Sequence, residues 1–326
     1  MKEKKKGSCL KTILIVIAVI AVLGILISSL GGDRDESTSK IEESSAASGE
    51  SKDTEGSTED PATEEPAPEE QETPTDKIEQ SVPEQVLVEQ GGIRITLKGF
   101  NGNSLFGGEW GLLIENDGDK GVTVQAQDVT VNGVMIETIF SADIEPGKKA
   151  NDSIVFLSSD IEKADIQVMK DVSLKFHVFD SDTWETVFDT ERITVSANEG
   201  VSYAQSYDDS GMEILNQDGF RIVAKKVVDE ESFWGADLLV YIENNTDTDV
   251  TIQARDVSIN GFMIDPMFSC SIISGAKAFS QITFMSSSLE ENGIESIDSL
   301  DLSFHIFKTD GWDTILDSDS IAVNFN

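Results

Sequence analysis

The sequence contains one long segment twice: residues 104–195 and residues 232–323 align without a gap at a constant offset of 128 positions. The clearest match sets QAQDVTVNGVMI, starting at Gln125, against QARDVSINGFMI, starting at Gln253. A repeat of this length is too long for a solenoid unit and matches the size of a complete domain. We therefore expect two copies of one fold, over residues 84–198 (repeat 1) and 203–326 (repeat 2).

Both copies show the alternation of apolar and polar residues that predicts half-buried strands. Val122, Val124 and Ala126 fall on one face, for example, with polar residues between them. The apolar phase then slips by one residue, and the second copy slips at the same place, which predicts a β-bulge in each. Asn132-Gly133 and Asn260-Gly261 each separate two alternating stretches and predict type I′ hairpins.

Within the two repeats, helix signals are confined to residues 159–162 and 287–290. Both fit the S-x-x-E capping box and predict one helical turn each, which would place Ile161 and Leu289 on the core. Short strands separated by turns at roughly 8–12-residue intervals are typical of an antiparallel β-sandwich of the immunoglobulin type, with a barrel as the alternative. The expected fold class is all-β: two tandem immunoglobulin-like sandwiches after an N-terminal transmembrane helix and a disordered linker.

The N-terminus predicts a membrane anchor. Residues 12–30 form an uncharged, mostly apolar run, about 28 Å long as a helix, which matches a hydrocarbon core of roughly 30 Å. Residues 1–11 form a lysine-rich tail, so the positive-inside rule leaves this tail cytoplasmic and the remainder extracellular. A cleavable signal peptide is the alternative, but its apolar region is normally shorter, and Ser28-Ser29-Leu30 is a poor cleavage site.

Residues 31–83 are expected to form a disordered acidic stalk. They hold five of the seven prolines and almost no large apolar residue, so they bury too little surface to offset the entropy lost on ordering. The whole chain has a net charge of −37. Such a charge repels nucleic acid, so we expect no nucleic-acid partner, whereas cations, basic proteins and neutral glycans remain compatible with it.

Three pairs of short motifs carry a resemblance to a known family. They are Ile-Glu-Asn at 114–116 and 242–244, the Asn-Gly hairpins, and the strands around Phe176-His177 and Phe304-His305. The two repeats resemble the immunoglobulin-like domains of unknown function in secreted and membrane-anchored proteins of Gram-positive bacteria. This resemblance implies extracellular domains and transfers no catalytic residue.

His177 and His305 are the only histidines, and they occupy equivalent positions. Leu174, Phe176 and Val178 point to one side of the first strand, so His177 points to the opposite, polar side. Zinc usually takes three or four protein ligands, and neither repeat has a second histidine. We therefore expect surface histidines, with a role in ligand contact as the alternative, and we predict no metal site and no cofactor.

Acidic turns at 117–119, 180–182, 247–249 and 317–319 leave one further alternative, a divalent-cation-dependent binding module. Calcium takes six to eight oxygen ligands, but the sequence has no D-x-D-x-D-G loop with a closing Glu, and Asp180 becomes Lys308 in the second copy. Asp, Asn, Ser and Gly are also the residues that turns favour for conformational reasons. Ordinary turn chemistry is therefore the favoured interpretation.

Aromatic residues in the least similar stretch of the repeats supply a candidate contact surface. Phe106 and Trp234 are equivalent and lie beside glycines, and loops on rigid sandwiches often carry function. The candidate contact residues, together with the two histidines, are Phe106, Trp110, Phe233 and Trp234.

Three other positions are expected to be structural. Trp184 and Trp312 are equivalent and follow turns, and we expect them to close the ends of the cores, with a carbohydrate-stacking platform as the alternative. Cys270 has an alanine as its counterpart in repeat 1, which predicts a small buried residue and not a functional thiol.

Catalytic motifs do not occur: there is no G-x-S-x-G, G-x-G-x-x-G, phosphate-binding loop or H-E-x-x-H. We therefore expect a non-enzymatic, single-pass membrane-anchored extracellular protein. Its two immunoglobulin-like domains would bind an extracellular protein or glycan or serve a structural role at the envelope. A surface hydrolase is the least favoured alternative.

Overall fold

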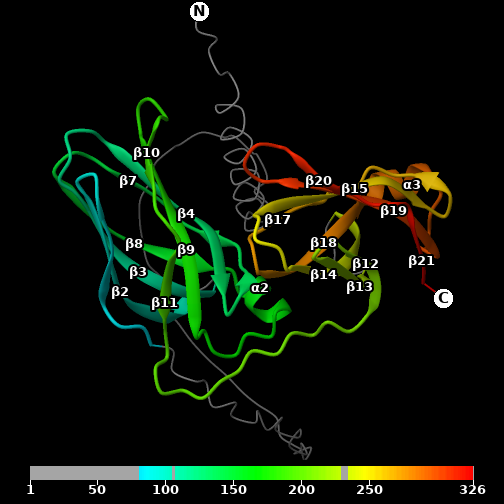
Figure 1. Cartoon of the computed structure of the whole chain (residues 1–326), viewed down its shortest axis with the longest axis horizontal. Helices are drawn as coiled ribbons and strands as arrows, with labels where there is room; N and C mark the ends of the chain where they lie inside the picture. Colours follow the sequence, from blue (N-terminus) through cyan, green and yellow to red (C-terminus); the bar gives the residue numbers. More distant parts are fainter. Residues whose placement is uncertain (1–80, 105–106, 229–233, 326) are drawn as a thin grey trace, which may run out of the picture. The chain divides into compact units, whose positions relative to one another are not determined.

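The computed structural model describes residues 81–104, 107–228 and 234–325. The basic tail, the expected anchor and nearly all of the stalk lie outside these ranges. Within them, no helix reaches the length and hydropathy that crossing a bilayer requires. The described part is all-β apart from two short helices, and its strands form immunoglobulin-like sandwich sheets (Figure 1).

Repeat 1 is built from two sheets. One has the strand order β1-β2-β3-β8-β6, and the other begins β10-β9-β4-β5, with β7 paired to β4 and β11 to β9. The strands are β1 (Gln85–Gln90), β2 (Ile93–Ser104), β3 (Gly107–Asn116), β4 (Val122–Val131), β5 (Val134–Met135), β6 (Thr138–Ile139), β7 (Ser141–Ile144), β8 (Lys148–Phe156), β9 (Asp171–Asp180), β10 (Thr186–Asp189) and β11 (Ile193–Ser196).

Repeat 2 uses the same plan. Strands β18-β14-β13-β12 form one side, and a sheet of order β16-β15-β19-β20 forms the other, with β17 paired to β15 and β21 to β19. The strands are β12 (Met212–Gln217), β13 (Phe220–Val228), β14 (Gly235–Asn244), β15 (Val250–Ile259), β16 (Phe262–Met263), β17 (Ser269–Ile272), β18 (Lys277–Met285), β19 (Ser299–Lys308), β20 (Thr314–Asp317) and β21 (Ile321–Asn324).

A cluster of buried apolar side chains fills each repeat. In repeat 1 it joins Leu112 of the first sheet to Val124 and Phe176 of the second. In repeat 2 it joins Ile242 to Phe304 in the same way. The alternating strands therefore place one face of each sheet on a core, which is the arrangement of a β-sandwich.

Both predicted hairpins are confirmed. Asn132 and Gly133 have φ of 52° and 79°, and Asn260 and Gly261 have 51° and 84°. Positive φ at both central residues defines the type I′ turn, whose twist matches that of the flanking strands. The bulges are confirmed as well, because the pairing of β4 with β9 and of β15 with β19 shifts register at Asp128 and at the equivalent position of repeat 2.

The two helices, α2 (Ser158–Lys163) and α3 (Ser286–Glu291), lie where the sequence predicts them. Ile161 and Leu289 pack against their respective cores, as expected. The predicted capping boxes are wrong, because Leu157 and Met285 occupy the N-cap positions and neither helix has a side-chain cap. Each helix begins two residues earlier than the motif implies, so the motif serine, Ser159 or Ser287, lies inside the first turn.

The repeated Ile-Glu-Asn motif has a structural cause. Asn116 is buried, and its Nδ2 donates to the carbonyl oxygens of Lys120 and Ile144 at 2.8 and 2.9 Å. Asn244 repeats this arrangement in the second copy with Thr248 and Ile272. A buried amide must find such partners, so the conserved position of the asparagine in both copies is explained by the turn that it holds.

The two repeats share one sheet. The order β10-β9-β4-β5-β18-β14-β13-β12 is continuous, because β5 of repeat 1 pairs in parallel with the start of β18 of repeat 2. The connecting residues 199–211 contain no strand. The sequence assigned residues 203–211 to repeat 2, yet Gln205 and Tyr207 donate hydrogen bonds to Ala164 and Asn132 of repeat 1.

Candidate functional site

The two histidines hold equivalent places on the outer faces of β9 and β19. Nδ1 of His177 lies 2.5 Å from Oδ1 of Asp189, and Nδ1 of His305 lies 2.5 Å from Oδ1 of Asp317. Because an ionised carboxylate only accepts hydrogen bonds, Nδ1 is the donor, which leaves Nε2 as the acceptor of the neutral ring. The carboxylate therefore fixes both the tautomer and the orientation of each ring.

The prediction of surface histidines is right about the face and wrong about exposure. The His177 and His305 side chains are only 17% and 11% exposed. The cause is a phenyl ring two residues further along each strand, since Phe179 and Phe307 lie 5.2 Å from the histidine rings between centroids.

Each phenyl ring in turn carries a tryptophan. Phe179 stacks on Trp184 with 5.5 Å between centroids, and Phe307 stacks on Trp312 with 5.1 Å. We call each group an aromatic stack. The stack of repeat 1 comprises Asp189, His177, Phe179 and Trp184, and that of repeat 2 comprises Asp317, His305, Phe307 and Trp312.

The expectation that Trp184 and Trp312 close the cores is wrong. Both are 59% exposed and lie on the outside of the sheet. Their backbones have φ of 62° and 67°, a left-handed conformation that costs a bulky residue about 1–2 kcal/mol. Strained backbone of this kind clusters at functional sites, and here the same strain recurs in both copies.

The turn that carries Trp184 is organised by Asp180. Its carboxylate accepts a bond from Nζ of Lys120 at 2.9 Å and from the backbone N–H groups of Asp182 and Thr183 at 3.0 Å. These bonds, chiefly that from Lys120, lower the pKa of Asp180 to about 2. The backbone N–H of Trp184 donates to the Asp180 carbonyl at 2.9 Å, which completes the turn.

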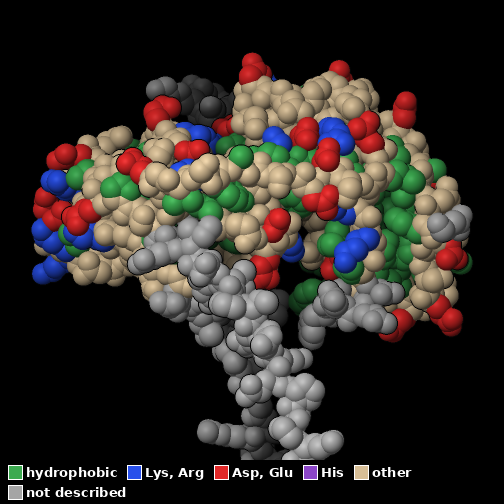
Figure 2. Space-filling view, turned by 90° about the horizontal axis from the view of Figure 1, so that it is seen from below, with side chains coloured by type: hydrophobic (Ala, Val, Ile, Leu, Met, Phe, Trp, Pro, Cys, Tyr) green, Lys and Arg blue, Asp and Glu red, His purple; other side chains and the backbone are tan. Residues whose placement is uncertain are grey.

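The Asp180 carboxylate, in one of the four acidic turns, is thus engaged by bonds within that turn and by Lys120. Within residues 81–104, 107–228 and 234–325, no three His, Cys, Asp or Glu side chains converge in a way that could hold a metal ion. On the face that Figure 2 shows, acidic and basic side chains are interspersed with hydrophobic ones. The divalent-cation alternative gains no geometric support from the described residues.

Of the four aromatic residues that the sequence singled out for a contact surface, the structure describes Trp110 and Trp234. Trp110 is 1% exposed and packs edge-on against Phe156 at 5.5 Å, so its assignment to a contact surface is wrong. It alternates inward on β3, where a large ring fills the core. Trp234 is partly exposed, and Phe106 and Phe233 lie outside the described residues.

The residues that complete the site were missed from the sequence. Phe179 and Phe307 lie on the polar face of their strands, two positions after each histidine, and are nevertheless buried because a tryptophan covers them. A large apolar residue on the polar face in both copies was the available signal. Asp189 gave none, since its pairing with His177 depends on the register of β10 on β9.

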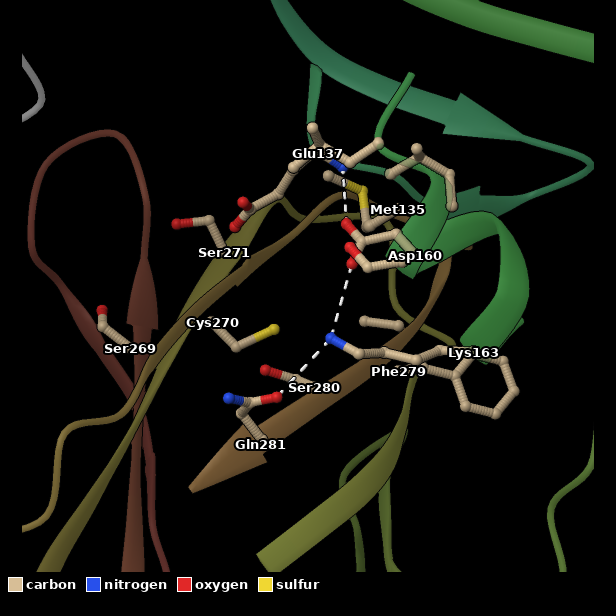
Figure 3. Close-up of a pocket in the computed structure, with 14 residues that line it drawn as sticks. Met135, Glu137, Asp160, Lys163, Ser269, Cys270, Ser271, Phe279, Ser280 and Gln281 are labelled. Carbon is tan, nitrogen blue, oxygen red and sulfur yellow. Dashed lines mark hydrogen bonds and ion pairs between the residues drawn. The ribbon is translucent and has the colours of Figure 1, made fainter. Parts of the chain in front are cut away.

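A second feature is a cavity of about 520 Å³ between the repeats (Figure 3). Nζ of Lys163 lies 3.6 Å from Oδ1 of Asp160 on the same helix. On the other side of the cavity, Oε1 of Gln281 lies 3.5 Å from the same Nζ. Cys270 lies on its repeat 2 side and is buried, as predicted, and this burial raises the pKa of the thiol to about 12. A thiol that stays protonated at neutral pH is a poor nucleophile.

Each aromatic stack brings together an exposed indole, a buried phenyl ring, an imidazole and a carboxylate. In the part of the chain that the structure describes, the imidazoles contact a carboxylate and a phenyl ring, and neither is hydrogen-bonded to a hydroxyl or a thiol. A nucleophile next to its base is the geometric signature of a covalent hydrolase. Each aromatic stack presents an exposed indole ring that stacks on a phenyl ring, and the phenyl ring in turn lies beside an imidazole.

Comparison with known proteins assigns no family: no family model matches the chain, and no curated protein matches it. Solved structures show a distant similarity to chaperone-usher chaperones, which have tandem immunoglobulin-like domains. The YadV chaperone is 13% identical over 67% of this chain and 92% of its own, with a TM-score of 0.21. The SafA pilin–SafB chaperone complex of Salmonella enterica is 10% identical over 67% of this chain and 89% of its own, with a TM-score of 0.20. The CupB2 chaperone of Pseudomonas aeruginosa is 10% identical over 67% of this chain and 92% of its own, with a TM-score of 0.18. Similarity at this level says nothing of a shared function.

Proposed function

We propose that the chain is a single-pass membrane-anchored extracellular protein whose two immunoglobulin-like repeats bind a glycan through their aromatic stacks. The observation that carries this proposal is the exposure of Trp184 and Trp312 in a strained backbone conformation, each over a phenyl ring. The basic tail, apolar run and acidic stalk support the cell-membrane location, and the resemblance to domains of Gram-positive surface proteins agrees with it.

A stacked tryptophan suits a sugar ring for physical reasons. Most of the indole surface faces solvent, so its flat face can cover the apolar C–H groups of a pyranose. Asp189 and Asp317 supply hydrogen-bond acceptors in the same groups of side chains, and sugar hydroxyls are donors. The acidic chain repels anionic polymers, so neutral glycans are the favoured class.

A protein ligand is the second candidate. Val187 and Ile315 are equivalent, lie on β10 and β20 close in sequence to the tryptophans, and are 44% and 36% exposed. A tryptophan flanked by aliphatic side chains is also the composition of a protein-binding hot spot. A glycan and a protein ligand would contact the same tryptophans, so the two candidates differ only in the chemical class of the ligand.

Co-sedimentation of the purified full chain with insoluble peptidoglycan and with neutral polysaccharides tests the proposal. We expect retention on at least one of them and loss of retention in the Trp184→Ala/Trp312→Ala chain. If none of these polymers retains the chain, glycan binding is refuted and a protein ligand becomes the better explanation.

A further inference from the structure

The same hairpin occurs in both repeats in different surroundings. In repeat 1, Val134 is 1% exposed and Met135 is half-buried. Their counterparts in repeat 2, Phe262 and Met263, are 47% and 68% exposed, and Met267 nearby is 57% exposed. Three large apolar side chains thus reach solvent at one end of repeat 2. Exposed apolar side chains are normally scattered singly over a protein surface, so a cluster of three needs an explanation.

The surroundings of the first hairpin explain the difference. Its Gly133 carbonyl accepts a hydrogen bond from the backbone N–H of Lys277 at 2.9 Å, and Val134 pairs with Lys277 across the joint between the repeats. Met135 packs against the core of repeat 2, and Phe279 packs against the core of repeat 1. The contact therefore combines a backbone bond with an exchange of apolar side chains, which is a form of β-sheet augmentation.

This contact runs from the end of one repeat to the opposite end of the next. In repeat 2, Ile259 pairs with Leu300 at the hairpin end, whereas Val250 pairs with Lys308 at the far end. The start of β18, which receives the first hairpin, lies near that far end, where β17 also pairs with Val250. A single head-to-tail contact between two repeats uses the hairpin end of only one of them, so the hairpin end of repeat 2 is left exposed.

We propose that the hairpin surface of repeat 2, formed by Gly261, Phe262, Met263 and Met267, docks on another protein by the same mode. The partner must offer a β-sheet edge built like the start of β18: a free backbone N–H, small or apolar residues before it, and an aromatic side chain two residues after it. The proposal does not depend on the aromatic stacks, which lie away from the hairpin end.

A second copy of this chain lacks the matching surface. The start of β8 pairs with β3 as β18 pairs with β14, so the backbone is equivalent. However, Asn151 stands where repeat 2 has Phe279, and Glu145 and Lys148 stand where repeat 2 has buried Ile273 and Ala276. Charged side chains at a sheet edge prevent edge-to-edge pairing, so the occupant is a different protein.

Grafting the receiving surface onto repeat 1 tests this directly. The full chain carrying Glu145→Ile, Lys148→Ala and Asn151→Phe presents the receiving residues of repeat 2, so its copies should join head to tail. Sedimentation in the ultracentrifuge should show a monomeric wild type and a variant that self-associates at least tenfold more tightly. Adding Met263→Asp should return the variant to monomers.

The contrary results are equally specific. A grafted chain that keeps its β-sheet circular dichroism and stays monomeric at 100 µM overturns the proposal. A wild type that self-associates, and stops when Met263 is changed to Asp, shows that a second copy is the occupant and overturns the assignment to a different protein. Should the triple variant unfold, Asn151→Phe alone carries the test, because Asn151 is exposed.

Discussion

Trp184 stacks on Phe179 with 17° between the ring planes, although the Trp184 backbone adopts a left-handed conformation that disfavours large side chains. Trp312 and Phe307 repeat the relationship with 10° between their planes. A ring that only had to fill a core would lie between the sheets, as Trp110 does. The duplicated geometry instead holds a ring outside each sandwich.

Replacing Trp184 by glycine should change stability little. The substitution removes a stacking contact of about 0.5–1.5 kcal/mol and relieves a backbone cost of about 1–2 kcal/mol. We expect the free energy of unfolding, measured by urea titration, to change by less than about 1 kcal/mol because these two contributions oppose each other.

Trp312→Gly is the matched control in the other repeat and should behave alike. A loss of stability of several kcal/mol in either variant would contradict the view that these rings are presented for contact and would restore a structural role.

Trp110→Ala should be far more damaging. The ring is buried against Phe156 in the core of repeat 1, and truncation of a buried aromatic residue costs about 3–5 kcal/mol. Thermal unfolding followed by circular dichroism should show the loss, with Trp184→Ala as the exposed control. Equal melting temperatures in the two variants would contradict the assigned burial of Trp110.

Local patterns predicted the strands, the bulges and both Asn-Gly hairpins because each depends on a few neighbouring residues. The period of two along β9 also placed His177 on the outer face. The aromatic stacks could not be derived in the same way. They require the register of β10 on β9, which brings Asp189 to His177, and a left-handed residue at Trp184 that no propensity favours.

The contact between the first hairpin and the start of β18 could not be predicted from the sequence either. Val134 and Phe262 are equivalent apolar residues in identical turns, yet one is buried and the other exposed. The difference arises from a contact between segments far apart in the chain, Gly133 and Lys277. Periodicity within a strand gives no information about such a contact.

The Cys270 thiol should be unreactive in the folded chain. Burial raises its pKa to about 12, so the reactive thiolate is scarce at pH 8. We expect iodoacetamide to label the Cys9→Ser chain only after urea unfolds it. The thiol of the unfolded chain ionises near its ordinary pKa of 9.0. The contribution of Cys270 to the free energy of unfolding is therefore fully present below pH 9 and declines as the pH rises toward 12.

Labelling of Cys270 in the folded chain at the rate of a free cysteine would contradict this. The same labelling after Met135→Ala would instead show that the first hairpin protects the thiol, since Met135 and Cys270 line the same cavity.

Asp180 should make the free energy of unfolding depend on pH in the acid range. Its pKa is about 2 in the folded chain and 3.8 ordinarily, so its contribution is present above about pH 4 and fades as the pH falls through 2. Asp180→Asn should lower the urea midpoint at pH 6, and the difference from wild type should shrink by pH 2.

Lys120→Gln removes the largest cause of the lowered pKa and should reproduce that pH profile. A difference between Asp180→Asn and wild type that stays constant from pH 6 to pH 2 would show that the carboxylate acts only through its shape.

The most direct test of glycan recognition compares the dissociation constants of four chains for one insoluble neutral glycan: wild type, Trp184→Ala, Trp312→Ala and the double variant. Two linked sites gain affinity from their high effective concentration, so each single variant should weaken binding roughly 10²-fold or more on a repetitive polymer. The double variant should show no binding while keeping the circular dichroism and melting temperature of the wild type. Full retention of affinity by the folded double variant would contradict glycan recognition by the aromatic stacks.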